Sequence, residues 1–336
     1  MKAMLLQELG SIAEGRIPLS YAEIPEPEPA ADQVLIRISA CAVCHTELDE
    51  IEGRTPPPRL PVVPGHQVVG RIESGGRVGQ RVGVAWIFSA CGTCEYCASG
   101  RENLCAAFQA TGRDANGGYA EYMTAQADYV HPIPDELSDA EAAPLLCAGA
   151  VGYRALILSG IDDGATLGLY GFGASNHLVL KTAKKKYPRL RIFVFSRNLK
   201  ERTQALELGA AWSGAIQDEP PEPMTAAIDA TPAWLPMIEA MRHLIPGGRL
   251  VVNAIRKEDV DKGELLKLDF SSSLWLEKEL KSVANVTRQD VRGFLSLAAE
   301  LGIRPEYEEY ALKDANQALF EIKHGRIRGA KVLRIP

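Results

Sequence analysis

Two kinds of hydrophobic pattern divide the chain. In residues 1–130, short apolar runs such as DQVLIRISA and QRVGVAWI alternate with stretches that are rich in glycine and proline. The longest of these stretches is EGRTPPPRLPVVPGHQVVGRIESGGRVGQRVG. Short β-rich runs that are separated by turn residues predict a small β-barrel with short connections.

The pattern changes near residue 138. SDAEAAPLLCAGAVGYRALILSG is helical in composition, with Ser138 and Glu141 spaced as a capping box. From residue 165 to about 275, the strands ATLGLYGFG, RIFVFSR, AAIDAT and GGRLVVNAI alternate with helices such as ASNHLVLKTAKKKY and NLKERTQALELGA. This alternation predicts a parallel sheet, and an amphipathic helix, TRQDVRGFLSLAAELG, and a strand, AKVLRI, follow it.

Composition limits the class of protein. The 336 residues are enough for two domains, and a net charge of −6 disfavours a nucleic-acid partner. The N-terminal MKAMLLQELGSIAEG lacks the pattern of a signal peptide, and no apolar run approaches the ~18–20 residues of a membrane span. We therefore expect a cytoplasmic protein without a membrane partner, in which thiols stay reduced.

Four of the seven cysteines form a cluster along the chain. Cys91, Cys94, Cys97 and Cys105 follow the spacing C-x2-C-x2-C-x7-C, which can wrap one tetrahedral, coordinatively closed Zn²⁺. An iron–sulfur run would need C-x2-C-x2-C-x3-C followed by proline. A nucleic-acid-binding zinc ribbon would need interleaved basic and aromatic residues, which are absent. The spacing predicts a structural zinc lobe at about residues 90–106.

A second set of metal ligands is spread along the chain. Cys44 could be joined by His66 and Cys147, and two sulfurs with one nitrogen would leave the fourth tetrahedral position open for water or substrate. Each residue alone is weak evidence, because a buried cysteine is usually a small hydrophobe. The hypothesis rests on their joint occurrence with the four-cysteine cluster and with Gly171-x-Gly173, which follows a strand and opens a helix.

Five motifs together resemble the zinc-dependent alcohol dehydrogenases of the medium-chain dehydrogenase/reductase superfamily. They are CAVCHTEL, PVVPGHQVVGRI, CGTCEYCASGRENLC, PLLCAG and GLYGFGAS. The resemblance covers essentially the whole chain. It implies an α/β fold, with a GroES-like β-rich catalytic domain (residues 1–147) and a Rossmann doubly wound parallel-sheet domain (148–278). Residues 279–336 are then expected to return to the catalytic domain.

The resemblance also implies roles for individual residues. Cys44, His66 and Cys147 match the catalytic-zinc ligands, Thr46 the hydroxyl that relays the substrate proton, and Glu47 the carboxylate that holds the liganding histidine. His45 falls where the family places a residue near the cofactor phosphates. Cys41 matches no ligand, so we expect it to serve in packing.

Two positions depart from the family pattern. Gln67 stands where the family usually has a glutamate after the liganding histidine, and Asp49 stands where several members end the proton relay with a histidine. Both departures leave the details of the zinc chemistry and of the relay open.

The cofactor site is predicted from the residues that follow the strands of the parallel sheet. Gly171 permits a tight turn and Gly173 lets the backbone approach a pyrophosphate at the helix N-terminus, whereas Asn176, in place of a third small residue, predicts looser helix–strand packing there. Ser196 and Arg197 replace the acidic residue that would favour NAD, so we predict that NADP(H) is preferred over NAD(H), with stacking of Arg197 on adenine and use of both cofactors as the alternative. The predicted cofactor-binding residues are His45, Gly171, Phe172, Gly173, Ala174, Ser175, Ser196, Arg197, Asn253, Ala254, Ile255 and Arg328.

The sequence thus predicts a zinc-dependent alcohol dehydrogenase or aldehyde reductase with two zinc ions per chain, one catalytic and one structural. Zinc would act as a Lewis acid on the alcohol oxygen, hydride would pass to NAD(P)+, and Thr46 would relay the proton. A zinc-free quinone or enone reductase, or a non-catalytic NADP-binding protein, is the alternative. We expect a small alcohol or aldehyde substrate and a homodimer or homotetramer. Trp86, Phe88 and Trp275 are candidates for pocket walls, with core packing as the alternative.

Overall fold

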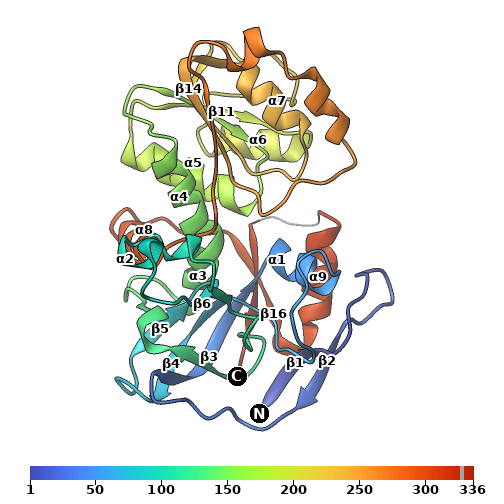
Figure 1. Cartoon of the computed structure of the whole chain (residues 1–336), viewed down its shortest axis with the longest axis vertical. Helices are drawn as coiled ribbons and strands as arrows, with labels where there is room; N and C mark the ends of the chain where they lie inside the picture. The colour runs from blue at the N-terminus through green and yellow to red at the C-terminus, as the bar shows by residue number, and fades with distance from the viewer. Residues whose placement is uncertain (326–328) are drawn as a thin grey trace. The chain divides into compact units, whose positions relative to one another are not determined.

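A computed structural model describes residues 1–325 and 329–336, and the chain divides into two compact units (Figure 1). Unit 1 comprises Met1–Ala150 and Val286–Pro336, and unit 2 comprises Val151–Asn285. Each unit is described by itself.

Unit 1 is built on a seven-stranded sheet in the order β16-β17-β3-β4-β5-β9, with β8 also paired to β3. The strands are β3 (Gln33–Val43), β4 (Gln67–Ser74), β5 (Arg81–Val84), β8 (Tyr122–Gln126), β9 (Val130–Pro132), β16 (Tyr307–Ala311) and β17 (Ala330–Arg334). Along β3, Val34, Ile36 and Ile38 are buried whereas Arg37 between them is exposed. This alternation places every second side chain in one core. The C-terminal β17 runs antiparallel to β3, so the C-terminal segment completes a sheet that is otherwise built from residues 33–132.

Short elements surround this sheet. The remaining strands are β1 (Lys2–Leu6), β2 (Leu19–Glu23), β6 (Ile87–Ser89) and β7 (Gln109–Ala110). The helices of unit 1 are α1 (His45–Ile51), α2 (Glu95–Ala98), η1 (Glu102–Leu104), η2 (Ala127–Tyr129), α3 (Asp139–Pro144), η3 (Leu145–Gly149), α8 (Arg288–Glu300), η6 (Leu312–Asp314) and α9 (Ala315–Lys323). The helix α1 was not predicted, because HTELDEI carries three carboxylates and little apolar periodicity. The capping box that was predicted from Ser138 and Glu141 is present at the start of α3.

Unit 2 is a six-stranded parallel sheet in the order β12-β11-β10-β13-β14-β15, as the alternating pattern predicted. Its strands are β10 (Thr166–Tyr170), β11 (Arg191–Phe195), β12 (Trp212–Gly214), β13 (Met224–Asp229), β14 (Leu244–Val252) and β15 (Glu279–Ser282). Tyr170 is in register with Phe195 on one side and with Asp229 on the other. The loops that follow β10, β11 and β13 therefore leave the sheet side by side, at the edge where parallel α/β sheets bind ligands.

Helices connect these strands. They are α4 (Ala150–Leu158), α5 (Ala174–Lys186), α6 (Leu199–Glu207), α7 (Leu235–Arg242), η4 (Lys262–Lys267) and η5 (Phe270–Leu274). The ranges predicted for α5 and α6 agree with the structure to within three residues at their ends. The fold class is thus confirmed as α/β, with a β-rich unit and a unit built on a parallel doubly wound sheet.

The helical run Asp139–Leu158 is long and apolar enough to cross a membrane by length and composition, which the sequence analysis did not register. Its most apolar window has a mean hydropathy of 1.3, and 56% of that window is buried inside the structure. A core helix of a soluble protein satisfies the same criterion, so the run is weak evidence for a membrane span.

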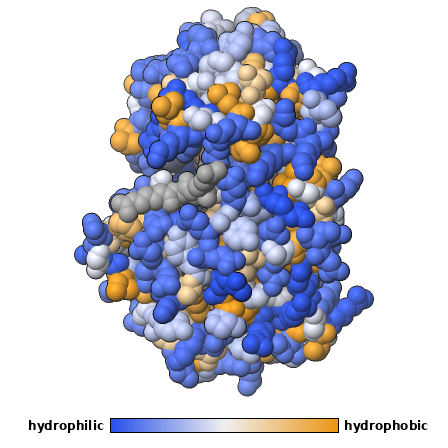
Figure 2. Space-filling model, turned by 180° about the vertical axis from the view of Figure 1, so that it is seen from behind, coloured by the Kyte–Doolittle hydropathy of each residue, from blue (hydrophilic) through white to orange (hydrophobic). Residues whose placement is uncertain are grey.

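Several of the large hydrophobic side chains that remain exposed lie within residues 255–280 of unit 2. They include Ile255, Val260, Leu266, Phe270, Trp275, Leu276 and Leu280. On the face shown in Figure 2, hydrophobic residues form small groups that are separated by hydrophilic ones.

Candidate metal centres and cofactor-binding turn

Three side chains that are distant in sequence converge in unit 1. Cys44 precedes α1, His66 precedes β4, and Cys147 lies within the π-helical η3. Their ligand atoms all lie within 4.8 Å of one another, and Cys44 Sγ is 3.7 Å from His66 Nε2. Two sulfurs and one imidazole nitrogen at these separations form a donor set that suits Zn²⁺.

Cys44 is held in place because it is also the N-cap of α1. Its backbone is extended (φ −141°, ψ −174°), and its Sγ accepts a hydrogen bond from Thr46 N at 3.3 Å. In return, the Glu47 carboxylate accepts a hydrogen bond from Cys44 N at 2.9 Å, which completes a capping box. The helix start therefore fixes the direction in which this sulfur points.

The same glutamate orients the histidine. Glu47 Oε1 lies 2.6 Å from His66 Nδ1, and both side chains are fully buried. Burial by itself would raise the pKa of Glu47, but the neighbouring charge and hydrogen bond of His66 outweigh it and lower the pKa. A hydrogen bond from Nδ1–H to the carboxylate leaves Nε2 free to act as the ligand, on the side where Cys44 lies.

The pKa of Cys44 is raised well above its usual value. The main cause is its hydrogen bond with Cys147, followed by burial and by the charge of Glu47. Thiols that are crowded in this way keep their protons until a cation displaces them. The donor set thus has the chemistry of a metal site.

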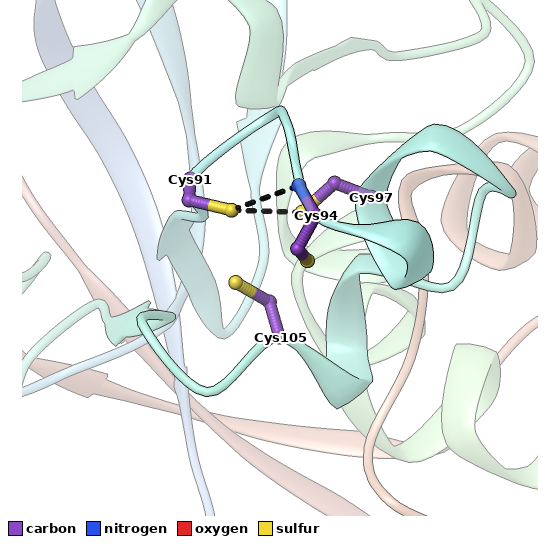
Figure 3. Close-up of side chains that lie close together, drawn as sticks. All are labelled: Cys91, Cys94, Cys97 and Cys105. Carbon is purple, nitrogen blue, oxygen red and sulfur yellow. Dashed lines mark hydrogen bonds between the residues drawn. The ribbon is translucent and has the colours of Figure 1, made fainter.

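The four cysteines of the 90–106 segment also converge (Figure 3). Their sulfurs lie within 4.8 Å of one another, with Cys91 Sγ and Cys97 Sγ 3.8 Å apart. The pKa of Cys91 falls to about 6 because the backbone N–H groups of Thr93 and Cys94 point at its sulfur. Burial, opposed by a Gly92 N–H and aided by neighbouring thiols, raises the pKa of Cys97 to about 12. Four sulfurs around one centre leave no position for a substrate.

The glycine-rich turn after β10 has the geometry that a pyrophosphate needs. Gly171 has φ +75°, and a Cβ there would lie 2.7 Å from Thr231 Cγ2. A Cβ on Gly173, the N-cap of α5, would meet nothing within 4 Å. The backbone in front of the helix N-terminus is therefore open to an anionic ligand, as expected for Gly173.

Looser packing at Asn176 was expected, and this expectation is wrong. Asn176 is fully buried, and its Nδ2 donates to the carbonyl oxygens of Tyr170 at 3.0 Å and Gly171 at 2.8 Å. The amide thus fastens the first turn of α5 to the end of β10. A small residue at this position would let the helix pack closely on the strand. The Asn176 amide instead holds the helix to the strand with two donated hydrogen bonds.

The end of β11 carries both residues that were predicted to read the ribose phosphate. Ser196 is buried, and its hydroxyl donates to Glu201 Oε2 at 2.5 Å. Arg197 is exposed, and its guanidinium makes no ion pair within the described residues. Gly171 N donates to Phe195 O at 2.8 Å. Ser196 and Arg197, which follow Phe195, therefore lie next to the glycine-rich turn.

The other predicted cofactor residues of unit 2 lie close to this turn or follow β14. Asn253 Nδ2 donates to Ser175 Oγ at 3.0 Å, which places the segment after β14 against the start of α5. Ala254 is half-buried and Ile255 is exposed, whereas Phe172 is buried. Ala174 is the first residue of α5. Arg328 lies outside the described residues.

The predicted relay residues lie on α1 in unit 1. His45 is exposed, and the Thr46 hydroxyl makes no hydrogen bond within residues 1–325 and 329–336. Asp49 Oδ1 accepts a hydrogen bond from Arg54 Nε at 2.5 Å. This ion pair with a guanidinium, which does not lose its proton, was not anticipated from the sequence.

The aromatic candidates for pocket walls divide between core and surface. Trp86 and Phe88 are buried, and Trp86 packs against Phe108 with ring centroids 5.0 Å apart. Trp275 is 56% exposed and packs against Phe270. Trp86 thus belongs to a hydrophobic cluster, whereas the role of Phe88 and Trp275 as pocket walls stays a prediction.

A buried ion pair in unit 2 was also missed. Lys257 Nζ lies 2.5 Å from Asp229 Oδ2 and donates to the carbonyl oxygens of Thr231 at 2.9 Å and Ala233 at 2.8 Å. Asp229 ends β13, whereas Lys257 follows β14 in a polar segment. Nothing in the local sequence pattern indicates that the two meet.

Comparison with known proteins agrees with this geometry. The model of the family described as "Alcohol dehydrogenase GroES-like domain" matches residues 30–135. The chain is 40% identical over 346 residues to "Probable alcohol dehydrogenase AdhA" of Mycobacterium tuberculosis (strain CDC 1551 / Oshkosh), covering 100% of this chain and 97% of that protein.

Two solved structures share the fold. One is CAD from Helicobacter pylori complexed with NADP(H), with a TM-score of 0.85, 20% identity, and coverage of 99% of this chain and 97% of the other. The second is a cobalt- and zinc-bound thermostable alcohol dehydrogenase from Pyrobaculum aerophilum, with a TM-score of 0.84, 21% identity and 99% coverage of both chains. Because the full length of the chain aligns at 40% identity with a curated alcohol dehydrogenase, the chain belongs to the zinc-dependent alcohol dehydrogenase family of the medium-chain dehydrogenase/reductase superfamily.

Proposed function

We propose that this protein interconverts a small alcohol and its aldehyde or ketone by hydride transfer with a nicotinamide dinucleotide. The observation that carries the proposal is the convergence of Cys44, His66 and Cys147, whose ligand atoms lie within 4.8 Å of one another. Three protein ligands of this kind are typical of catalytic zinc sites, which keep one position for substrate.

Zinc held by these three residues would supply Lewis-acid chemistry at the alcohol oxygen. Glu47 keeps His66 in the tautomer that can bind a metal. The Thr46 hydroxyl, which has no partner in the described residues, accepts the substrate proton and passes it outward. His45, exposed next to it, is proposed to face the cofactor phosphates.

The second proposed zinc has a structural task. Cys91, Cys94, Cys97 and Cys105 would close the coordination sphere, so this ion stabilises the 90–106 lobe and does not take part in the reaction. The structure from Pyrobaculum aerophilum is described as cobalt- and zinc-bound, which supports metal binding on this fold.

The proposed cofactor residues are those at the carboxyl edge of the sheet in unit 2, with NADP(H) preferred over NAD(H). The exposed and unpaired guanidinium of Arg197 supports this preference, because arginine suits a 2′-phosphate. The Helicobacter pylori structure, which has the same fold, is described as complexed with NADP(H), and this supports the proposal.

We further propose a homodimer or homotetramer in the cytoplasm. Strand β15 lies at the edge of the six-stranded sheet and all four of its residues are exposed, so its outer edge can pair with another strand. The exposed Leu276 and Leu280 adjoin this edge. All seven cysteines are unpaired, in keeping with a reducing compartment.

Metal analysis tests the proposal. The wild-type protein should contain two zinc ions per chain, and Cys44→Ser should retain one while losing alcohol oxidation. Cys41→Ala is the matched control, because Cys41 is buried outside both clusters and should keep both ions. Activity of Cys44→Ser, or loss of zinc from Cys41→Ala alone, would contradict the assignment. A panel of alcohols and aldehydes with NAD and NADP then identifies the substrate class.

A further inference from the structure

The hydroxyl that was predicted to bind a ribose phosphate already donates its only hydrogen to another side chain. Ser196 Oγ donates to Glu201 Oε2 at 2.5 Å and accepts a hydrogen bond from Asn198 N at 3.0 Å. Glu201 lies in the first turn of α6, three residues after the N-cap Asn198, which itself follows the strand-end pair Ser196–Arg197. A carboxylate therefore stands beside the hydroxyl, although the strand end itself has no acidic residue.

The position of this pair is that of the adenosine ribose in dinucleotide-binding sheets. Phe195 is in register with Tyr170, and its carbonyl oxygen accepts a hydrogen bond from Gly171 N at 2.8 Å. Ser196 is thus one residue beyond the strand that borders the glycine-rich turn. A dinucleotide whose pyrophosphate lies at that turn would bring its ribose 2′ position to the end of β11.

Charged side chains of both signs, two cations and one carboxylate, follow Ser196 in the sequence. Arg197 and Lys200 are exposed, and their side chains make no ion pair within the part of the chain that the structure describes. Glu201 is half-buried and likewise has no cationic partner there. Since no cationic side chain among residues 1–325 and 329–336 pairs with the Glu201 carboxylate, its charge acts on the group that occupies the 2′ position.

We propose that Glu201 is a specificity-determining residue that favours NAD(H) and limits the NADP(H) preference contributed by Arg197. To bind a 2′-phosphate, Ser196 must turn its hydroxyl hydrogen from Glu201 to the phosphate. The carboxylate then faces a group that carries about −1.5 to −2 charges. A ribose 2′-OH carries no charge and can donate to the same carboxylate. This inference rests on the cofactor site proposed above.

The test is the ratio of kcat/KM for NADP to kcat/KM for NAD. Glu201→Gln retains the size of the side chain and an acceptor for Ser196 but removes the charge. We expect this ratio to rise about 10-fold, with kcat/KM for NAD unchanged or lower. Glu207→Gln is the matched control, because Glu207 is exposed at the other end of the same helix and should leave the ratio unchanged.

Binding supplies a readout that does not depend on turnover. Fluorescence titration should show the dissociation constant of NADPH falling in Glu201→Gln while that of NADH does not. The difference from wild type should shrink at high salt, because screening weakens the repulsion. A ratio within twofold of wild type, or a lower ratio, overturns the inference.

A separate variant distinguishes failure of the cofactor site from failure of this inference. Arg197→Ala should lower the NADP/NAD ratio if the end of β11 reads the ribose. If Arg197→Ala and Glu201→Gln both leave the ratio unchanged while both cofactors bind, the proposed location of the ribose is wrong and the inference falls with it. If only Glu201→Gln is without effect, the location stands and the role of Glu201 is refuted.

Discussion

Glu47 and His66 form a buried pair in which Oε1 lies 2.6 Å from Nδ1. The other oxygen of the same carboxylate accepts the backbone N–H of Cys44, so one side chain positions two of the three converging ligands. This dual contact explains why a glutamate three residues after Cys44 matters. It is both the N3 residue of the capping box and the partner of the histidine.

Glu47→Gln should therefore weaken metal binding without removing a ligand. We expect zinc affinity at the three-ligand site to fall 10- to 100-fold, because an amide neither fixes the imidazole tautomer as strongly nor raises its basicity. Competition with a chromogenic chelator measures this affinity. Glu73→Gln, on an exposed position of β4, should not change it. Equal affinities for wild type and Glu47→Gln would refute the orienting role.

Lys257→Met should destabilise unit 2. The Asp229 side chain is fully buried and the Lys257 side chain is 9% exposed, and the substitution would leave the Asp229 carboxylate without its cation. Breaking such a pair costs about 3 kcal/mol, which thermal denaturation can detect as a lower Tm. Lys262→Met, which removes only an exposed ion pair with Asp259, should change stability by less than about 0.5 kcal/mol. Adding Asp229→Asn to Lys257→Met should recover part of the loss. If it does not, the unpaired charge is not the cause.

Gly149→Ala should disturb the segment that carries Cys147. A Cβ at Gly149 would lie 2.2 Å from Phe294 Cε1 in α8, so the aromatic ring or η3 must move. We expect a loss of about 1–3 kcal/mol in stability and a lower zinc content. Gly263→Ala, where a Cβ meets nothing within 4 Å, is the matched control and should be neutral. Normal stability and two zinc ions in Gly149→Ala would show that the Phe294 ring or η3 can move without a loss of stability.

Glu52 should contribute to stability in a pH-dependent way. Burial alone would raise its pKa, but hydrogen bonds from Lys323, Arg54 and Ile12 N outweigh burial and lower the pKa to about 2. The folded state thus binds fewer protons than the unfolded state between pH ~4.5 and 2. The stabilisation is complete above that window and is lost as the pH falls through it.

Wild type should exceed Glu52→Gln in stability by about 2 kcal/mol at pH 7, after allowance for solvent screening. The difference should decline below pH ~4.5 and vanish near pH 2. Chemical denaturation at pH 7, 4 and 3 measures the change. Glu73→Gln, which loses no ion pair of the described residues, should match wild type at each pH. A difference that is constant with pH would indicate lost packing rather than linkage.

Local pattern was enough to predict most of the secondary structure in unit 2 and the start of α3 in unit 1. The period of each segment, the capping box at Ser138 and the glycines around residue 172 are properties of neighbouring residues, so they are visible in the sequence. The helix α1 was missed because its pattern is that of a polar loop. It forms because Cys44 and Glu47 cap it and because its buried side chains meet α9 and the core of unit 1.

The two metal clusters also differ in how far local sequence predicts them. The spacing of Cys91, Cys94, Cys97 and Cys105 is local, so it predicts a shared site directly. Cys44, His66 and Cys147 were linked through their resemblance to a family, because 22 and 81 residues separate them and no periodicity connects such positions.

The sequence by itself determined the succession of strands and helices, the local cysteine lobe and the identity of the chemical groups. Only the tertiary structure decided which distant groups meet. Glu201 faces Ser196, Lys257 reaches Asp229, and Asn176 ties α5 to β10 instead of loosening it. The physical reason is that side-chain pairing across elements depends on register and packing, which the whole fold sets and which no short stretch of sequence encodes.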